Sequence, residues 1–226
     1  MTASSVSAGT GASLPIQLEV YADIACPWCY VAEARLEQAL AARAGLKVTR
    51  RWRPFQLQPQ LPAEGLPWRG FAERKFGGWE RALAMFEQLG SVGRDAGIAF
   101  DFTGIQKANN TADAHRVVLL AERKGSGPAL AHGLFRAYFE KGRDLNDLDT
   151  LSEIAEAAGL ERDETRRYLQ SDENRAAVAE SQREAAELGV QGVPFYVFNR
   201  AYGVSGAQPV SVLLDVFDQI QKEVEV

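Results

Sequence analysis

The sequence has few metal-binding residues, no long apolar run and no excess of basic residues. Its 226 residues include only two cysteines and two histidines, whereas a structural zinc site usually takes four such ligands. No apolar run approaches the roughly 18 residues that a membrane span needs. The formal net charge is −5, and binding to phosphate backbones needs a basic surface. The sequence therefore predicts no metal site, no membrane partner and no nucleic-acid partner.

The first residues also lack the pattern of a secretory signal. Residues 1–14 are small and uncharged, without the basic and apolar regions of a signal peptide. We interpret them as a disordered leader and expect the protein in the cytoplasm. A permanent structural disulfide is disfavoured in that reducing compartment.

Residues 16–54 show a strand–helix–strand pattern. Ile16, Leu18 and Val20 alternate with polar or aromatic residues, which is typical of a strand. Helical spacing begins at Pro27, and alternation returns before Pro54. A connection of this length predicts a parallel pair of strands with a right-handed crossover.

The following block, residues 61–188, is dominated by helical patterns separated by glycines. Thr111 is a candidate cap for a helix that extends to Lys124. Thr150 with Glu153 has the spacing of a capping box. Further helices are expected over about 162–170 and 172–188.

The C-terminal part returns to strands. The runs 195–198 and 201–204 flank Asn199-Arg200, a plausible two-residue turn, and Pro209 opens an amphipathic helix. The predicted fold class is therefore α/β, with a βαβ unit, a large helical insertion and a ββα unit.

The sequence Cys26-Pro27-Trp28-Cys29 lies at the first strand-to-helix junction. Its spacing places both sulfurs on one face of the first helical turn. The free N–H groups and the dipole of that turn stabilise a thiolate, the nucleophilic form of cysteine. We predict that Cys26 is an exposed attacking thiol and Cys29 the resolving thiol. Half of a zinc site, two buried structural cysteines and a structural disulfide are the alternatives, and Trp28 is expected to cover the sulfurs.

These motifs resemble the DsbA-like thioredoxin superfamily, and within it the cytoplasmic FrnE-like DSBA oxidoreductases. The resemblance rests on the segments DIACPWCY, RWRPFQLQP, NNTADAHR, LFRAYFEKGRDL and GVPFYVFNRAYGVSGAQP, which span about 200 residues. It implies a thioredoxin-like domain from residues 15–60 and 189–226, with residues 61–188 inserted as a helical domain. It also implies that Cys26 is the nucleophile, Cys29 the resolving thiol and Pro194 a cis-proline beside them. The backbone of Val193 would then pair with an extended substrate.

Further residues are candidates for substrate binding or proton transfer. Pro27 and Trp28 adjoin the thiols, and Asn110 and His115 begin a predicted helix. Both Asn110 and His115 are candidate ligand contacts, with helix capping and structural hydrogen bonding as the alternatives. Asp23 is a possible proton acceptor for Cys29, with a local hydrogen bond at the strand end as the alternative.

Two further clusters of residues each have two possible roles. Arg50, Arg51 and Arg53 could attract an acidic thiol, but a solvated edge that discourages strand pairing is the better interpretation. Aromatic residues around the glycine-rich segment could line a cleft or pack the insertion. They are Trp68, Phe71, Phe76 and Trp79.

The sequence thus predicts a thiol–disulfide oxidoreductase that exchanges disulfides with protein, peptide or small thiol substrates. It needs no bound cofactor besides the reversible Cys26–Cys29 disulfide, with glutathione as a possible co-substrate. One alternative is a glutathione-dependent isomerase or transferase of the 2-hydroxychromene-2-carboxylate isomerase or kappa-class type. A second is a peptide-binding holdase.

Overall fold

A four-stranded sheet joins the two ends of the chain in the computed structural model, which describes residues 15–224. Its strands are β1 (Ile16–Ala22), β2 (Val48–Pro54), β5 (Phe195–Phe198) and β6 (Tyr202–Ser205), in the order β2-β1-β5-β6. β1 runs parallel to β2 and antiparallel to β5, and β5 is antiparallel to β6. The predicted α/β class, with a thioredoxin-like fold and a helical insertion, is confirmed.

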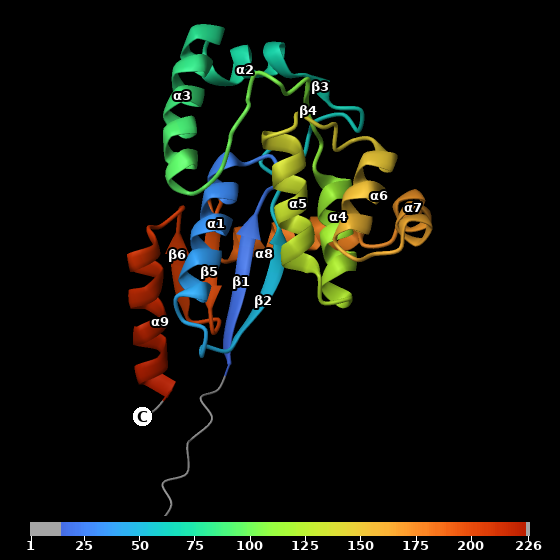
Figure 1. The fold of residues 1–226 in the computed structure, drawn as a ribbon. Coiled ribbons are helices and arrows are strands. Elements are labelled where there is room, and N and C mark those ends of the chain that lie inside the picture. The colour runs from blue at the N-terminus through green and yellow to red at the C-terminus, as the bar shows by residue number, and fades with distance from the viewer. Residues whose placement is uncertain (1–14, 225–226) are drawn as a thin grey trace, which may run out of the picture.

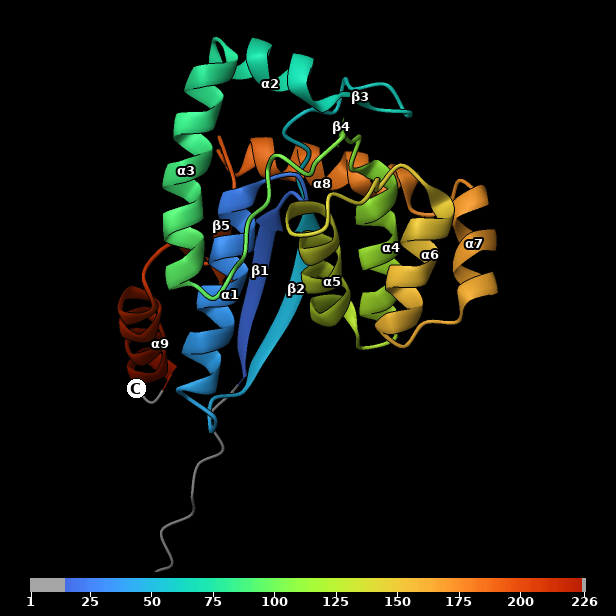
Figure 2. The same ribbon diagram turned by 45° about the horizontal axis from the view of Figure 1, so that its top comes forward.

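Strand β1 packs on both of its faces, because successive side chains point to opposite sides of a sheet. Leu18 and Val20 belong to the main core with α1 (Pro27–Ala41) and α9 (Val210–Val224). Tyr21 packs on the other face in a small cluster with Ala185 and Val190. Figures 1 and 2 show α1 and α9 side by side on one face, and α8 behind the sheet.

The segment between β2 and β5 is mostly helical. It contains β3 (Leu66–Pro67), α2 (Trp68–Phe76), α3 (Trp79–Asp95), β4 (Lys107–Ala108), α4 (Ala112–Arg123), α5 (Gly127–Phe139), α6 (Leu148–Ala157), α7 (Arg162–Gln170) and α8 (Arg175–Glu187). Helices α2 and α3 extend above the N-terminal end of α1, and α4–α7 form a layer beside the sheet (Figures 1 and 2). The inserted segment therefore borders the helix end that carries both cysteines.

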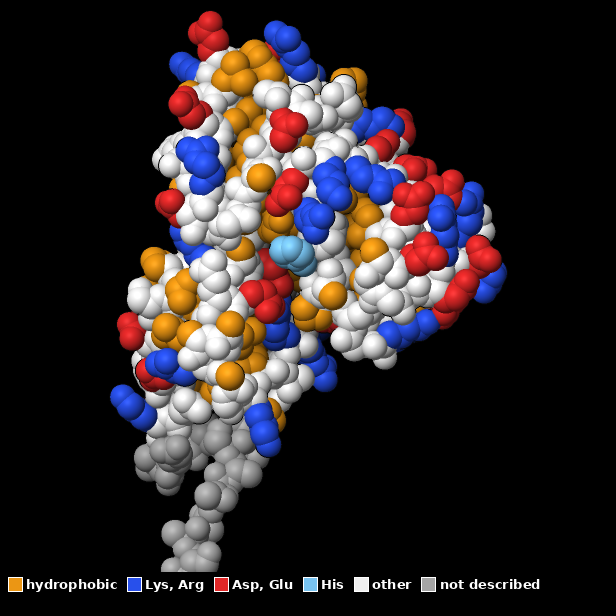
Figure 3. Space-filling view, viewed as in Figure 1, with side chains coloured by type: hydrophobic (Ala, Val, Ile, Leu, Met, Phe, Trp, Pro, Cys, Tyr) orange, Lys and Arg blue, Asp and Glu red, His pale blue; other side chains and the backbone are white. Residues whose placement is uncertain are grey.

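The outer face of α6 and α7 carries acidic and basic side chains in a mixed pattern (Figure 3). Several of them form ion pairs, including Arg143 and Arg162 with Glu153 and Arg166 with Asp149. This face therefore presents no single-sign field of the kind that attracts a polyanion. Within the described range, no helix combines the length and the apolar character needed to traverse a bilayer.

One predicted helix cap is wrong, and a second is correct in position but lacks the side-chain hydrogen bond. Thr150 and Glu153 do not form a capping box, because Asp147 is the N-cap of α6 and its carboxylate accepts from the N–H of Thr150 at 3.1 Å. Glu153 instead pairs with Arg143. Thr111 occupies the N-cap position of α4 without a side-chain capping bond. The hydrogen bond to Ala112 N comes from Asn110, so the neighbouring amide replaces the predicted hydroxyl.

The arginine cluster lies on the edge strand β2, as predicted, but two of its members are not simply solvated. Arg50 pairs with Glu33 and Glu37 of α1. Arg53 pairs with Glu19 of β1. These ion pairs attach the edge strand to its neighbours, while Arg51 is exposed.

Candidate functional site

Both cysteines lie at the N-terminal end of α1. Cys26 is the N-cap residue in an extended conformation, and Pro27 occupies the first turn. Proline fits there because the first N–H groups of a helix have no intrahelical acceptor. The carbonyl of Cys26 accepts from the N–H of Cys29 at 3.0 Å, which closes the first turn. Both cysteines are free thiols in this structure.

The segment before β5 is distant from the cysteines in sequence but lies beside them in the fold. The Cys26 Sγ atom donates a long hydrogen bond of 3.7 Å to the carbonyl oxygen of Val193. The peptide bond between Val193 and Pro194 is cis. Pairing of β5 with β1 brings this bond to the thiols, since Phe195 lies opposite Tyr21. The structure therefore brings Cys26, Val193 and Pro194 together, as the family resemblance implies.

The prediction that Cys26 is an exposed thiol is wrong. Its residue is only 4 % exposed, and Cys29 is 2 % exposed. The N-cap position packs Cys26 against the Val193 carbonyl, which the sequence pattern does not show. Cys26 nevertheless lines a cavity of about 180 Å³. The covered thiol therefore borders space that a substrate can occupy, while Trp28 stands 41 % exposed at its margin.

Burial disfavours the charged form of the Cys29 thiol. Burial raises the pKa of the Cys29 thiol well above its usual range, and the adjacent Cys26 raises it further. A buried thiolate is unfavourable because the protein interior solvates charge poorly. Cys29 therefore stays protonated until its proton is removed during the reaction.

Asp23 directly follows β1, is 1 % exposed and lines the cavity. Burial alone would raise its pKa, but the adjacent His115 and the backbone N–H groups of Leu57 and Ala25 outweigh burial and lower it. The N–H of Leu57 donates to Asp23 Oδ2 at 2.7 Å, and that of Ala25 to Oδ1 at 3.2 Å. Asp23 is thus an ionised carboxylate whose oxygens are already engaged.

The expected substrate contact of His115 is wrong. His115 has no exposed surface, and it does not line the cavity. Its Nδ1 accepts from Trp52 Nε1 at 3.0 Å, and its Nε2 lies 3.4 Å from Asp23 Oδ1. His115 is therefore a structural histidine that contacts Asp23 and does not face the cavity.

Asn110 does not line the cavity either. Its Nδ2 donates to the Leu61 carbonyl at 2.6 Å, and its Oδ1 accepts from Gln56 and from Ala112 N. The neighbouring Asn109 and Thr111 line the cavity instead. The sequence located the right segment, but not which of its side chains turns toward the cavity.

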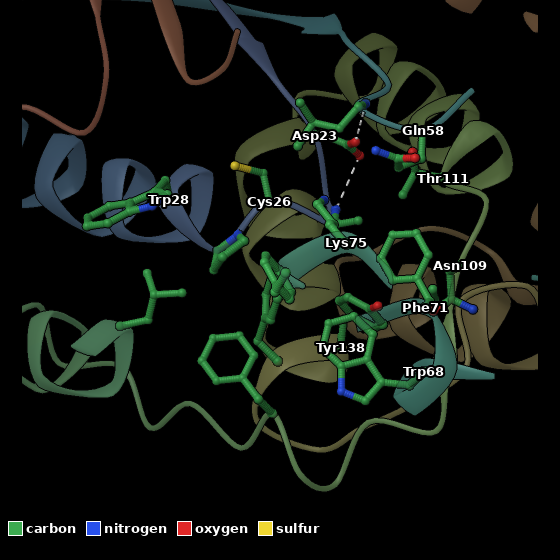
Figure 4. A pocket seen from close by; sticks show the side chains of 18 of the residues that line it. Asp23, Cys26, Trp28, Gln58, Trp68, Phe71, Lys75, Asn109, Thr111 and Tyr138 are labelled. Carbon is green, nitrogen blue, oxygen red and sulfur yellow. Dashed lines mark hydrogen bonds between the residues drawn. The ribbon is translucent and has the colours of Figure 1, made fainter. Parts of the chain in front are cut away.

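The cavity is mainly apolar, and the sequence did not place most of its wall. Figure 4 shows Trp68, Phe71 and Tyr138 grouped together, across from Cys26 and Trp28. The sequence left open whether the aromatic residues of the glycine-rich segment line a cleft or pack the insertion. Trp68, Phe71 and Phe76 line the cavity, whereas Trp79 is not a lining residue. Residues from α3 and α5 complete the wall, and they are Met85, Phe86, Leu89, Tyr138 and Phe139. Only the fold brings these helices together.

Metal ligation finds no support at this site. Across residues 15–224, no group of three or more His, Cys, Asp or Glu side chains is arranged to hold a metal ion.

Comparisons with known proteins agree with this geometry. The model of the DSBA-like thioredoxin domain family matches residues 17–218. The chain is similar to a crystal structure of a probable DsbA oxidoreductase from Streptomyces coelicolor, with 38 % identity, a TM-score of 0.81, and coverage of 90 % of this chain and 89 % of that one.

Two more distant structures share the fold. A 2-hydroxychromene-2-carboxylate isomerase is 18 % identical with a TM-score of 0.67, covering 92 % of this chain and 97 % of that one. The cytosolic disulfide reductase DsbM from Pseudomonas aeruginosa, determined with GSH, is 21 % identical with a TM-score of 0.61, again with coverage of 92 % and 97 %.

Proposed function

The chain belongs to the DSBA-like thioredoxin domain family, and we propose that it catalyses thiol–disulfide exchange with Cys26 as nucleophile and Cys29 as resolving thiol. Membership of this family makes it a DsbA-like oxidoreductase that acts on thiol or disulfide substrates. The observation that carries the finer proposal is the position of Cys26. It caps the N-terminus of α1, borders a cavity and has Cys29 one turn further along the helix.

The proposed reaction uses Cys26 and Cys29 in turn. The Cys26 thiolate attacks a substrate disulfide, forming a mixed disulfide and releasing one substrate thiolate. Cys29 then attacks the Cys26 sulfur, releasing the second substrate thiolate and closing the Cys26–Cys29 disulfide. Two electrons pass to the substrate, and the reverse sequence oxidises a dithiol.

The proton of Cys29 needs an acceptor during the second step. Asp23 is a weak base because its pKa is lowered, and its oxygens already accept from Leu57 and Ala25. We therefore assign the proton to the departing substrate thiolate, whose pKa is much higher than that of an ordinary carboxyl. Asp23 is assigned to holding the Ala25 and Leu57 segments beside the thiols.

The broader setting is part of the same proposal. We place the enzyme among FrnE-like members in the cytoplasm, with a thioredoxin-like domain of residues 15–60 and 189–226 around a helical domain of residues 61–188. Protein, peptide or small thiols are the exchange partners. Glutathione is proposed as the thiol that regenerates the reduced enzyme, and the disulfide reductase determined with GSH supports this choice.

Trapping of a mixed disulfide tests the assignment of the two thiols. The chain has two cysteines, so Cys29→Ser leaves Cys26 as its single thiol. This variant should accumulate one mixed disulfide per chain with glutathione disulfide, as measured by mass spectrometry, and should not turn over. Cys26→Ser should form no adduct while folded. Accumulation on Cys29 in place of Cys26 would reverse the assignment.

The same variants separate the alternative functions. A glutathione-dependent isomerase needs no second thiol, so its activity would survive Cys29→Ser. A holdase would suppress aggregation of an unfolded protein even after both cysteines are replaced by serine. The oxidoreductase assignment is supported if these variants lose disulfide exchange and retain neither isomerase activity nor suppression of aggregation.

A further inference from the structure

The cavity beside Cys26 has the size and lining of a site for one aromatic ring. Its volume is about 180 Å³, and an apolar cavity of about 150 Å³ holds a benzene molecule. Trp68 stacks on Phe71 at 6.0 Å and on Phe86 at 5.7 Å between ring centres, so the wall is built from aromatic faces. A ring inserted there would displace water from apolar surface, which is favourable.

One face of α2 supplies this wall and a cation. Trp68, Phe71 and Lys75 are spaced three and seven residues apart, which places them on one side of a helix. The Lys75 ammonium lies 5.4 Å from the centre of the Phe71 ring. Lys75 is exposed and also lines the cavity, so its charge stands at the opening.

Two hydrogen-bond donors of this face have no acceptor among the residues that the structure describes. Lys75 forms no ion pair with any side chain that the structure describes, although many other cations of the chain do. Trp68 is 8 % exposed, and its Nε1–H meets no acceptor within residues 15–224. A buried donor without a partner costs roughly 1–3 kcal/mol, so an acceptor on a bound molecule would be favoured.

The carboxylate of Asp23 lies at the inner side of the same cavity, beneath the backbone of Ala25 and Leu57. It repels an anion from that end, whereas Lys75 attracts one at the opening. The charges therefore orient an acidic aromatic molecule with its acid group toward α2.

We propose that the cavity selects aromatic thiols and disulfides that carry an acid group, with Lys75 and the Trp68 N–H binding the carboxylate. This inference rests on the proposed disulfide exchange at Cys26. The ring occupies the aromatic wall, and the sulfur attached to it meets Cys26. Glutathione has no ring, so its exchange at Cys26 would not use the aromatic wall.

The exchange step is balanced without a further reactant in a single turnover. Reduced enzyme reacts with an aryl disulfide to form a mixed disulfide between Cys26 and one aryl sulfur, and the other aryl group leaves as a thiolate. Attack by Cys29 then releases the second aryl thiolate. The enzyme loses two electrons, and the disulfide gains them.

Three disulfide probes separate the charge from the ring. Dithiobis(nitrobenzoate) is aromatic and carries a carboxylate on each ring, dithiodipyridine is aromatic and uncharged, and hydroxyethyl disulfide has neither feature. The second-order rate of each probe with reduced enzyme is measured by stopped flow and compared between variants within that probe. Comparison within a probe removes the intrinsic reactivity of its leaving group.

Lys75→Gln should slow the carboxylated probe about fivefold, as expected for loss of one partly exposed ion pair. Trp68→Phe keeps a ring but removes the N–H, and it should slow the same probe up to about tenfold. Both changes should slow hydroxyethyl disulfide less than they slow the carboxylated probe. Lys141→Gln is the matched control, because Lys141 is exposed and does not line the cavity.

Each remaining outcome has a definite meaning. An equal loss in Lys75→Gln and Lys141→Gln, or an equal loss for all three probes, would overturn the selective role of Lys75. A Trp68→Phe variant that leaves the carboxylated probe unchanged would remove the indole from the site. If the wild-type enzyme reacts with none of the probes through Cys26, the proposed disulfide exchange itself fails.

Discussion

The Nε2 atom of His115 lies 3.4 Å from Oδ1 of Asp23, and solvent reaches neither side chain appreciably. The opposite ring nitrogen, Nδ1, accepts a hydrogen bond from Trp52. In the neutral ring the proton therefore sits on Nε2 and faces the carboxylate. A histidine on α4 thus supports an ionised aspartate at the end of β1, directly behind the cavity.

Removing His115 should destabilise the protein and raise the pKa of Asp23. His115 lowers this pKa against the effect of burial, so a His115→Leu variant leaves burial dominant. We expect a loss of about 2 kcal/mol in the free energy of unfolding at neutral pH, since a buried charge loses a partner. Urea unfolding measures this loss.

The pH dependence of Asp23→Asn checks the same interaction. Because the pKa of Asp23 is lower in the folded state than in the unfolded state, its stabilising effect is complete above about pH 4. It is lost as the pH falls through the folded-state pKa. The stability difference between wild type and Asp23→Asn should therefore shrink on acidification. A difference that stays constant with pH would contradict the proposed ionisation.

Local patterns predicted the secondary structure around the site well. Alternation identified β1, and the Asn199-Arg200 turn between β5 and β6 is present with positive φ angles of 49° and 56°. The cap of α6 was missed because Asp147 and Thr150 are both good capping residues three positions apart. Sequence preference alone does not choose between them.

Long-range contacts explain what the sequence did not predict. The covering of Cys26 depends on Val193, which is 167 residues away. The burial of His115 depends on the packing of α4 against β2, where Trp52 meets its ring. Neither contact leaves a periodic pattern near the residue it affects, so the chemistry of the motif was predictable but its exposure was not.

Alkylation should distinguish the two thiols of the reduced, folded enzyme. Burial raises the pKa of Cys29, so its thiolate is scarce near pH 8 and its reaction with iodoacetamide should be slow. Modification should therefore occur first at Cys26, with Cys29 reacting only at higher pH or after unfolding. Peptide mass spectrometry over time reports both sites. Equal rates at Cys26 and Cys29 in folded enzyme would contradict this prediction.

Two glutamates of α1 should contribute very differently to stability, although both pair with Arg50. The Glu33 side chain is 3 % exposed and that of Glu37 is 53 % exposed. Breaking a buried pair leaves a charge without a partner, so Glu33→Gln should cost about 3 kcal/mol. Glu37→Gln should cost about 0.5 kcal/mol, as exposed pairs do. Denaturant unfolding of both variants measures these losses of stability. Similar losses in the two variants would contradict the prediction.

Arg116 should be a structural clamp that acts without affecting the redox site. It is completely buried on α4, and its guanidinium donates to the carbonyl oxygens of Tyr168, Leu169, Ser171 and Glu173. The Tyr168 and Leu169 carbonyls lie in the last turn of α7, where the intrahelical ladder ends. Those of Ser171 and Glu173 lie in the turn before α8. Lysine has fewer donors and no planar fork, so it cannot replace this set.

Arg116→Lys should therefore lower the free energy of unfolding by about 3 kcal/mol, because several buried carbonyls lose their donors. Arg123→Lys is the matched control on the same helix, since the Arg123 side chain is 52 % exposed and pairs with the exposed Glu173 carboxylate at 2.7 Å. It should change stability by less than about 0.5 kcal/mol. Both variants should react with hydroxyethyl disulfide at the wild-type rate, because neither arginine lines the cavity. A slower reaction in Arg116→Lys alone would show that the clamp also positions the thiols, and equal stabilities would show that lysine satisfies the carbonyls.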